Sequence, residues 1–349
     1  MHINPSIQRR ARTFDASGFG GRAFDAAGAS GFAFLQSQLE QIDTDLVKPL
    51  SAVTHPRDIP VEVITGWPDY ISAYSANFAS TGTKYLGLQG TNNTEIANVQ
   101  ADLQKGIWKV FNWTAGMVIT WLDLQKMYET QKNGMPAPFS LQELYEEACA
   151  ELYAKAGDYV TYWGFLGQPG LVNNTNVAET AVPNGASGHT TWTTKTPAEI
   201  LNDINYLLNA VMANCAYAAQ EGMPDRALVP YTQFALLTQP MTLGGLGGFQ
   251  SIKEYVEKNC IAAHHGVDFK INFLPNDWIS GQGAGSPATD RIVVYRNDKK
   301  SQYLKASPVV KAMTVPSTRN GGSYETMWAA AISQVVFKRT QTSIYGDGI

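Results

Sequence analysis

Three glutamates are the residues of this chain whose type and spacing could most readily do chemistry. Glu143, Glu146 and Glu147 could act as the paired carboxylates of a glycoside hydrolase, one as acid and one as nucleophile or base. The same residues follow Ser140, and Ser140-Leu-Gln-Glu143 has the spacing of a helix capping box. Acidic side chains in a first helical turn also stabilise the positive end of the helix dipole. The structural interpretation is therefore favoured over the catalytic one.

The remaining motifs lack the spacing that catalysis or ligand binding requires. The glycine runs 244–248 and 281–285 do not follow the phosphate-binding pattern of a strand, a glycine loop and a helix. Residues 185–189 fall short of a serine nucleophile elbow. His264 and His265 are adjacent, so regular structure points them in different directions. The sequence therefore predicts no catalytic, cofactor-binding or metal-binding residues, and no enzyme.

Cysteine usage and hydropathy place the chain in a reducing, aqueous compartment. Cys149, Cys215 and Cys260 are scattered through predicted helices without a paired spacing, which does not indicate a disulfide framework. The first residues have no apolar run of the kind that a signal peptide needs, and no stretch approaches 18 apolar residues. We therefore expect a protein of cytoplasmic origin with no membrane partner.

Composition favours a protein whose surface meets other protein. Charged residues make up 16% of the chain, against about 25% in an ordinary soluble domain, whereas Gly (31), Tyr (16) and Trp (8) are plentiful. The net charge of −4 argues against a dedicated nucleic-acid binder. The one basic cluster, around Arg9, Arg10 and Arg12, is interpreted as a solvated tail, or as an arm that touches a neighbouring subunit or DNA.

Periodicity predicts a mixed α+β fold with a domain boundary near Gly170. A long helix over 140–164 would be roughly 36 Å in length. Its apolar face would comprise Leu141, Leu144, Ala148, Leu152, Ala156, Tyr159 and Trp163. Thr196-Pro-Ala-Glu199 opens a second capped helix. Other helices are predicted at 35–50, 231–238 and 251–259, strands at 59–64, 107–113, 117–122, 227–230, 269–274, 292–296 and within 324–344, and a flexible loop at 241–248.

Two segments have too little pattern to bury a face within their own domain. Residues 67–95 alternate weakly and predict a long two-sided hairpin or loop, which is unusual inside a compact domain unless it has a purpose. Residues 1–34 are rich in glycine and contain a short repeat, with Phe14 and Phe24 at equivalent positions. Both segments are therefore expected to lie on neighbouring subunits.

The order of these elements resembles the Hong Kong ninety-seven type (Johnson) fold of the major capsid proteins of tailed bacteriophages. The resemblance covers most of the chain from about residue 34 and rests on the joint order and spacing of six runs. They are Phe34-Leu-Gln-Ser-Gln-Leu-Glu-Gln-Ile-Asp43, Gly170-Leu-Val-Asn173, Leu228-Val-Pro-Tyr231, Ile252-Lys-Glu-Tyr-Val-Glu257, Asp290-Arg-Ile-Val-Val-Tyr-Arg-Asn-Asp298 and Tyr345-Gly-Asp-Gly-Ile349.

The resemblance implies a division of the chain into four regions. Residues 1–54 would be an N-terminal arm and 67–95 an E-loop that reaches across the adjacent subunit. A peripheral (P) domain would comprise 55–66, 96–171 and 312–349, with a spine helix, and an axial (A) domain would comprise 172–311. The candidate intersubunit contacts in the arm and the E-loop are Phe14, Phe24, Trp67, Tyr70, Tyr74, Lys84 and Tyr85.

The family also implies partners. Homo-pentamers and homo-hexamers would form an icosahedral shell around double-stranded DNA, which a mildly acidic chain contacts weakly. The virion would be assembled in the host cytoplasm, with a portal as a partner and a cement or decoration protein as an optional one. Residues 1–34 are too short and glycine-rich for the helical scaffolding segment of some relatives, so a separate scaffolding protein or prior proteolysis is implied. Some relatives form Lys–Asn cross-links, for which Lys84 is the candidate.

Three alternatives stay open on the sequence. An encapsulin-like nanocompartment would share the fold, enclose enzymes and form smaller shells. A carbohydrate-active enzyme, suggested only by abundant Trp, Tyr and Asn, would be a monomer of about 38 kDa with two facing carboxylates. A tail-tube or head-connector protein accounts less well for the long helix and the split domain.

Overall fold

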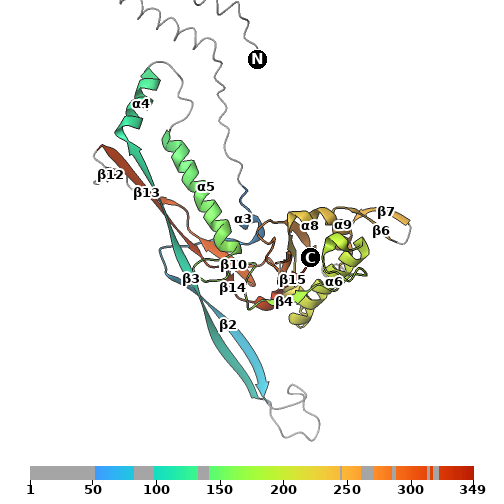
Figure 1. Cartoon of the computed structure of the whole chain (residues 1–349). Coiled ribbons are helices and arrows are strands. Elements are labelled where there is room, and N and C mark those ends of the chain that lie inside the picture. The colour runs from blue at the N-terminus through green and yellow to red at the C-terminus, as the bar shows by residue number, and fades with distance from the viewer. Residues whose placement is uncertain are drawn as a thin grey trace, which may run out of the picture. The chain divides into compact units, whose positions relative to one another are not determined.

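The computed structural model describes residues 52–81, 98–132, 141–243, 246–260, 270–284, 288–312, 315–316 and 322–349. By its contacts the chain divides into Met1–Leu50 and Ser51–Ile349, and everything below concerns the second unit. Two main sheets with helices packed beside them make up its described part (Figure 1). The predicted α+β class is therefore confirmed.

The first sheet has eight strands in the order β1-β10-β13-β3-β2, with three short strands added at its side. They are β1 (Val61–Val63), β2 (Tyr70–Thr81), β3 (Asn98–Thr120), β10 (Gln302–Ala306), β11 (Val310–Lys311), β12 (Val315–Pro316), β13 (Ser323–Ser333) and β14 (Val336–Phe337). The pairs of β3 with β2 and with β13 are antiparallel, so segments from both ends of the described chain meet in one sheet.

Strand β3 has two different environments along its 23 residues. Residues 110–120 pair with β13 inside the sheet, whereas residues 98–109 pair with β2 alone and form a two-stranded ribbon. The sequence predicts two strands here, at 107–113 and 117–122. They are one, because β13 supplies a continuous hydrogen-bonding partner across Gly116. Trp121 and Leu122 instead begin a helix that the sequence did not predict, α4 (Trp121–Lys132).

Helix α5 (Leu141–Tyr162) matches the predicted long helix and packs on β3 and β13. Cys149 is buried there with Met117 and Trp328, and the Tyr153 hydroxyl donates to the carbonyl of Ser307 at 2.9 Å. Most of the apolar face expected from the sequence is not buried. Leu144 and Ala156 are half-buried, whereas Ala148, Leu152, Tyr159 and Trp163 stay exposed, because the buried side is centred on Cys149 and Val160.

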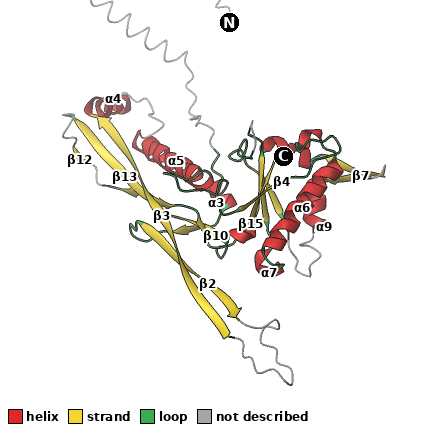
Figure 2. Ribbon diagram, turned by 60° about the horizontal axis from the view of Figure 1, so that its bottom comes forward, coloured by secondary structure: helices red, strands yellow, loops and turns green. Residues whose placement is uncertain are grey.

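The second sheet has the order β4-β15-β9-β5-β8 and carries the larger core. Its strands are β4 (Ala178–Ala181), β5 (Arg226–Val229), β8 (Asn272–Pro275), β9 (Arg291–Tyr295) and β15 (Ser343–Asp347). Helix α6 (Pro197–Asn214) covers one face through a row of leucines, isoleucines and valines, with α8 (Tyr231–Leu237) and α9 (Ile252–Asn259) alongside (Figure 2). The predicted capping box of Thr196 and Glu199 is present.

Several bounds differ from the sequence expectation. The predicted loop 241–248 contains strands β6 (Pro240–Leu243) and β7 (Leu246–Ser251), which form a hairpin. Helix α6 ends at Asn214, and the left-handed Ala216 and Tyr217 turn the chain into α7 (Ala219–Gly222). A short helix, α3 (His55–Asp58), precedes β1, and single 3-10 turns span Trp192–Thr194 and Thr340–Thr342.

The end of the chain joins the second sheet. Strand β15 pairs with β9 and β4 of the second sheet, whereas the resemblance assigns all of 312–349 to the P domain. Every residue of β15 and of β9 is buried, which requires a position between other strands and under a helix. Tyr345 anchors the strand, since its hydroxyl donates to the Leu171 carbonyl at 2.7 Å.

Candidate functional site

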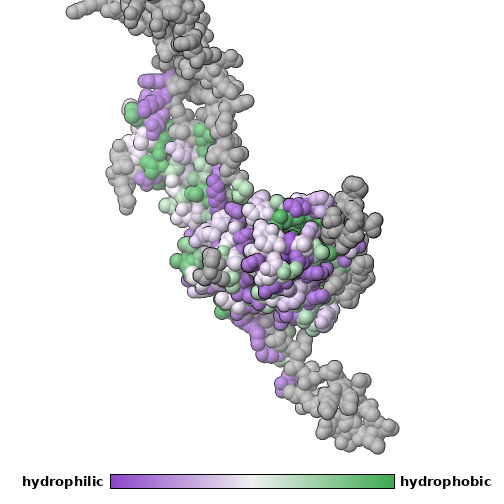
Figure 3. All heavy atoms as spheres, turned by 45° about the vertical axis from the view of Figure 1, so that its right-hand side comes forward, coloured by the Kyte–Doolittle hydropathy of each residue, from purple (hydrophilic) through white to green (hydrophobic). Residues whose placement is uncertain are grey.

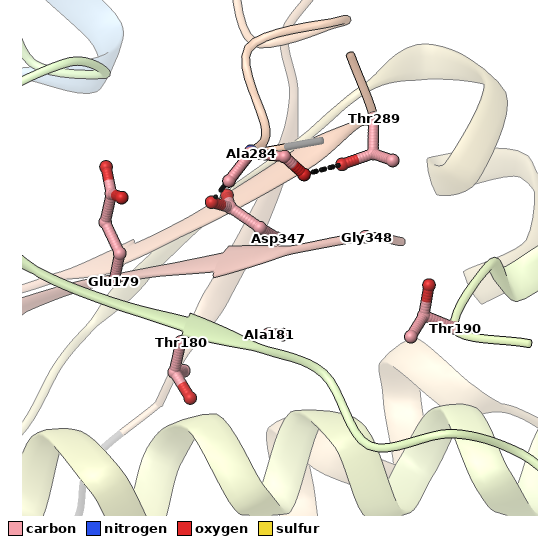
Figure 4. A pocket seen from close by; sticks show the side chains of 8 residues that line it. All are labelled: Glu179, Thr180, Ala181, Thr190, Ala284, Thr289, Asp347 and Gly348. Atoms are coloured by element: carbon pink, nitrogen blue, oxygen red, sulfur yellow. Dashed lines mark hydrogen bonds between the residues drawn. The ribbon is translucent and has the colours of Figure 1, made fainter. Parts of the chain in front are cut away.

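A pocket of about 420 Å³ lies where β4 and β15 end (Figure 4). Its polar lining includes Glu179, Thr180, Thr190 and Asp347, a set that could in principle bind a small polar ligand. The Asp347 carboxylate is already occupied, however, by the Arg291 guanidinium at 2.6 and 2.9 Å and by the Ala284 amide at 3.0 Å.

One arginine links the two carboxylates of this pocket. Arg291 also donates to Glu179 at 2.8 Å and to the Val172 carbonyl at 2.7 Å, and its guanidinium lies 4.5 Å from the Tyr345 ring centre. Burial alone would lower the pKa of Arg291, but the hydrogen bond and charge of Asp347, together with Glu179, raise it. A charged arginine with four hydrogen bonds joins β15, β4 and the segment at Val172, which is a structural rather than a catalytic role.

The residues that the sequence offered for chemistry do not converge. Glu146 pairs with Lys311. Residues 185–189 form a tight turn in which the Gly185 amide donates to the His189 carbonyl at 2.9 Å. His264, His265 and Ser140 lie outside the described residues. Within the described residues, no three His, Cys, Asp or Glu side chains are grouped so as to hold a metal ion.

A buried polar cluster that the sequence did not reveal ties α3 to α5. Asp158 accepts hydrogen bonds from the amides of Thr54 and His55, and its Oδ1 lies 2.7 Å from His55 Nδ1. Asp58 accepts from the Tyr162 hydroxyl at 2.6 Å and from the Asn276 side chain at 2.8 Å. Burial, and then the charge of Asp58, raise the pKa of Tyr162, which keeps this hydroxyl a donor. The cluster therefore fixes how the chain enters the first sheet.

The ribbon of β2 and β3 has one open apolar face. Tyr70 and Tyr74 lie on the same side of β2, and Leu103 and Ile107 lie on the same side of β3. The pairing register of the two strands puts all four side chains on one face of the ribbon. Each of these side chains is at least 60% exposed. Lys105 and Lys109, directly opposite the tyrosines, share this face.

The other face of the ribbon is closed where the ribbon leaves the sheet. Ile71 is buried, and the Trp108 ring lies across Gly106, where an added Cβ would be 2.3 Å from the ring. A small hollow of about 180 Å³ beside Trp108 is bounded by Phe337 and Lys338. The structure thus separates an inner face, with packing partners, from an outer face that has none among the described residues.

Three of the seven predicted contact residues can be located. Tyr70 and Tyr74 lie on the open face of the ribbon, and Trp67, which is also exposed, lies in the turn before β2. Phe14, Phe24, Lys84 and Tyr85 lie outside the described residues. Leu103 was missed because the strand was expected to begin only at residue 107. Ile107 was placed in that expected strand but was not predicted to be a contact.

Helix α4 forms a second exposed apolar surface that the sequence did not predict. Trp121, Leu122 and Tyr128 are all more than half exposed, and no described side chain of this helix is buried. Green, hydrophobic patches are visible over the part that carries α4 and α5 (Figure 3). Trp121, Leu124 and Tyr128 are spaced so that they share one side of the helix, and this spacing is the signal that could have indicated a contact surface.

No helix among the described residues is both long enough and apolar enough to cross a bilayer.

A comparison with protein families matches residues 87–349 to the model described as major capsid protein. A comparison with curated proteins found no match.

Solved structures similar to this chain are shells of phages and related particles. The capsid of Myoviridae phage XM1 aligns with a TM-score of 0.68 at 14% identity, over 90% of this chain and 98% of the other. The capsid of a native GTA particle gives 0.58 at 9% identity, over 88% and 94%. The structure from Mycobacterium phage Che8 gives 0.53 at 11% identity, over 88% and 96%.

Proposed function

Because this chain belongs to the major capsid protein family and is a structural subunit of a phage head shell, we propose that the open face of its β2–β3 ribbon holds neighbouring subunits together. The likeness to solved phage capsids confirms the Hong Kong ninety-seven type fold expected from the sequence. The chain assembles with copies of itself into an oligomeric shell and resides in the virion. The family indicates a structural role rather than catalysis.

The open face of the ribbon is the observation that supports this proposal. Tyr70, Tyr74, Leu103 and Ile107 are exposed together on one side of a two-stranded element. Two strands without a covered face are at best marginally stable in water. Burial against a second subunit would remove these side chains from water at about 25 cal/mol per Å² of apolar area. Exposed aromatic side chains are the type most enriched at such contacts.

The regional division remains part of the proposal. We assign 1–54 to an arm, 67–95 to an E-loop, 55–66, 96–171 and 312–349 to a P domain, and 172–311 to an A domain. The pairing of β15 with β9 supports moving the last strand, Ser343–Asp347, to the A domain. Phe14, Phe24, Lys84 and Tyr85 are proposed as contacts on sequence grounds alone.

The assembly proposed is a shell of pentamers and hexamers around double-stranded DNA, built in the host cytoplasm. A separate scaffolding protein and a portal are the proposed partners, with a cement or decoration protein as an addition. The net charge of −4 supports weak contact with the packaged DNA, since tight binding would need clustered Lys and Arg.

Electron microscopy and sizing of the purified protein test this function. We expect closed shells, or capsomers that close into shells when the partners are added. Changing Tyr74 to Asp should abolish shells while leaving the fold intact, because a carboxylate replaces an aromatic ring at the contact. The readouts are particle counts and circular dichroism.

The matched control is Tyr217→Asp. Tyr217 is 68% exposed, close to the 63% of Tyr74, and its positive φ of 60° suits aspartate. The control should assemble as the unmodified chain does. Stable wild-type monomers of 38.1 kDa that never assemble would contradict the proposed function.

A further inference from the structure

Helix α3 lies where the two main sheets meet, and it is hydrogen-bonded to both sides (Figures 1 and 2). On the side of the first sheet, Thr54 and His55 bond to Asp158 of α5. On the side of the second sheet, the Tyr295 hydroxyl of β9 donates to the Asp58 carbonyl at 2.5 Å. One short helix therefore connects the helix that packs on the first sheet with a strand of the second.

A single carboxylate oxygen of α3 makes the same connection directly. Asp58 Oδ2 accepts one hydrogen bond from the Tyr162 hydroxyl at 2.6 Å and another from Asn276 Nδ2 at 2.8 Å. Tyr162 is the last residue of α5, and Asn276 comes directly after β8. Burial, and then the charge of Asp58, raise the pKa of Tyr295 as they do for Tyr162, so both hydroxyls remain donors.

The apolar packing between the sheets does not by itself fix the angle at which they meet. Leu304 and Ile332 of the first sheet share one core with Leu228 and Val293 of the second. Burial of apolar surface is favourable but has no preferred direction. This core therefore holds the sheets together, whereas the hydrogen bonds of α3, which are directional, decide how the sheets are turned.

Two short connections between the sheets run side by side and form a candidate hinge. Residues 296–301 lead from β9 to β10, and residues 338–342 lead from β14 to β15. The Lys338 amide donates to the Ser301 carbonyl at 2.9 Å, which joins the two connections. Hinges are typically a few residues at the ends of elements. Helix α3 lies at this hinge, because its partner Tyr295 is the last residue of β9.

The buried charge at this place needs an explanation other than stability. The Asp58 side chain is completely buried. Taking a carboxylate out of water costs free energy that apolar residues of similar volume would not cost. A buried polar network whose members are all bonded instead favours one arrangement of the parts that it joins. The parts that Asp58 joins are the two sheets.

We infer that α3 holds the two sheets at one angle, and that this angle sets the curvature and hence the diameter of the shell. This inference rests on the proposed shell function and adds the element that controls the geometry of the shell. The first sheet carries the exposed ribbon and α4, whereas the strands of the second sheet are covered within the subunit. The rotation between neighbouring copies decides whether an assembly closes. A change in the angle between the sheets changes that rotation.

Deleting two hydroxyls tests the inference while the rings stay in place. The variant Tyr162→Phe with Tyr295→Phe removes one hydrogen bond from α3 to α5 and one from α3 to β9. We expect shells with a shifted mean diameter or a broader spread of diameters in electron micrographs. Shells with the diameters of the unmodified chain would overturn the inference.

The matched control deletes two hydroxyls whose bonds each stay within one side of the junction. The Tyr153 hydroxyl of α5 donates to the carbonyl of Ser307, beside the first sheet, at 2.9 Å. The Tyr206 hydroxyl of α6 lies 3.3 Å from Thr180 Oγ1 of β4, in the second sheet. Tyr153→Phe with Tyr206→Phe should therefore leave the shell diameters unchanged. The same change of diameter in the control as in the test variant would also overturn the inference.

A distance within the subunit decides the case in which the test variant forms no shells. Spin labels at Met327→Cys on β13 and at Tyr217→Cys after α6 report the separation of the two sheets, and both positions are exposed. Dilution with unlabelled copies restricts the measured distances to one subunit. We expect one narrow distance distribution in the unmodified and control chains and a broader or shifted one in the test variant. An unchanged distribution overturns the inference whether or not shells form.

The native thiols and the fold are checked in the same experiments. The chain without added cysteines keeps Cys149, Cys215 and Cys260 and gives the background label signal. If circular dichroism shows that the double variant does not fold, Tyr162→Phe alone is measured in the same way. Normal shells from the unmodified chain mean that the shell function stands even when the α3 assignment fails.

Discussion

At the scale of single residues, the buried ionic groups of this subunit secure the fold. Lys195 and Asp203 are almost completely buried and lie 2.5 Å apart, and the Trp192 Nε1 donates to the same carboxylate at 3.0 Å. Lys195 also donates to the Pro183 carbonyl at 2.6 Å. Burial raises the pKa of Asp203, against the opposing effects of Lys195 and Trp192. The pair thereby attaches the segment before α6 to the helix.

Removing one partner of this pair should destabilise the subunit strongly. In Lys195→Met, Asp203 remains buried without its counter-ion, at a loss of about 3–5 kcal/mol in the free energy of unfolding. The double variant with Asp203→Asn should recover part of the loss, because asparagine still accepts from Trp192 without a charge. Urea unfolding of the three proteins measures both effects.

The loss should also shrink on acidification. The pKa of Asp203 is higher in the folded protein than in the unfolded chain, so as the pH falls the folded state binds a proton before the unfolded state does. Lys195→Met therefore regains stability as the pH falls through the folded pKa of Asp203. An equal loss at neutral and acid pH would mean that packing, rather than the buried charge, explains the variant.

At the scale of elements, α5 is shaped by the small helix α3 that packs against it. The His55 ring lies over Gly157, where an added Cβ would be 2.7 Å from the ring carbon Cε1. Asp158, the next residue of α5, holds that ring and the first amides of α3. A glycine in the middle of a 22-residue helix is therefore a packing requirement.

The change Gly157→Ala should reverse the usual effect of helix propensity. Alanine normally stabilises a helix interior by about 1 kcal/mol relative to glycine. Here the clash with a buried, anchored ring should destabilise the subunit by about 1–3 kcal/mol. Thermal unfolding measures the difference.

Gly116→Ala is the control, since an added Cβ there meets nothing within 4 Å. Its stability should stay within about 0.5 kcal/mol of the unmodified chain. A Gly157→Ala variant as stable as this control would show that His55 moves aside freely.

At the scale of the molecule, the subunit from Ser51 onward has one well-covered sheet and one that is partly open. The second sheet has fully buried strands and its own helices. The first sheet carries the ribbon, α4 and α5, and each of these elements has exposed apolar side chains, such as Leu152 and Tyr159 on α5. This difference predicts that the part with the second sheet folds by itself, whereas the exposed apolar surfaces of the first sheet are covered by neighbouring subunits.

Shortening the ribbon should separate folding from assembly. Tyr74 and Lys105 pair across the ribbon, so replacing residues 74–105 by Asn-Gly keeps β2 and β3 joined through a tight turn. We expect a folded subunit with unchanged α-helical circular dichroism that forms no shells by size-exclusion chromatography. Shells of normal size from this variant would remove the ribbon from the assembly contacts.

The elements with strong local signals could be predicted from the sequence alone. The capping residues Thr196 and Glu199, the long helix from Leu141 and the buried strand Arg291–Tyr295 depend on neighbours along the chain. The exposure of Tyr70 and Tyr74 could also be expected, because weak alternation over a long segment left them no inner partner, whereas their role as contacts stays a prediction.

Only the tertiary structure decided which apolar faces are covered. The stripe of Leu152 and Tyr159 has the periodicity of a core face, yet β3 and β13 pack on the neighbouring side around Cys149. The unbroken length of β3 and the place of β15 likewise depend on partner strands distant in sequence. Local periodicity determines that a face is apolar, whereas what buries it depends on long-range packing and, in a shell protein, on the next subunit.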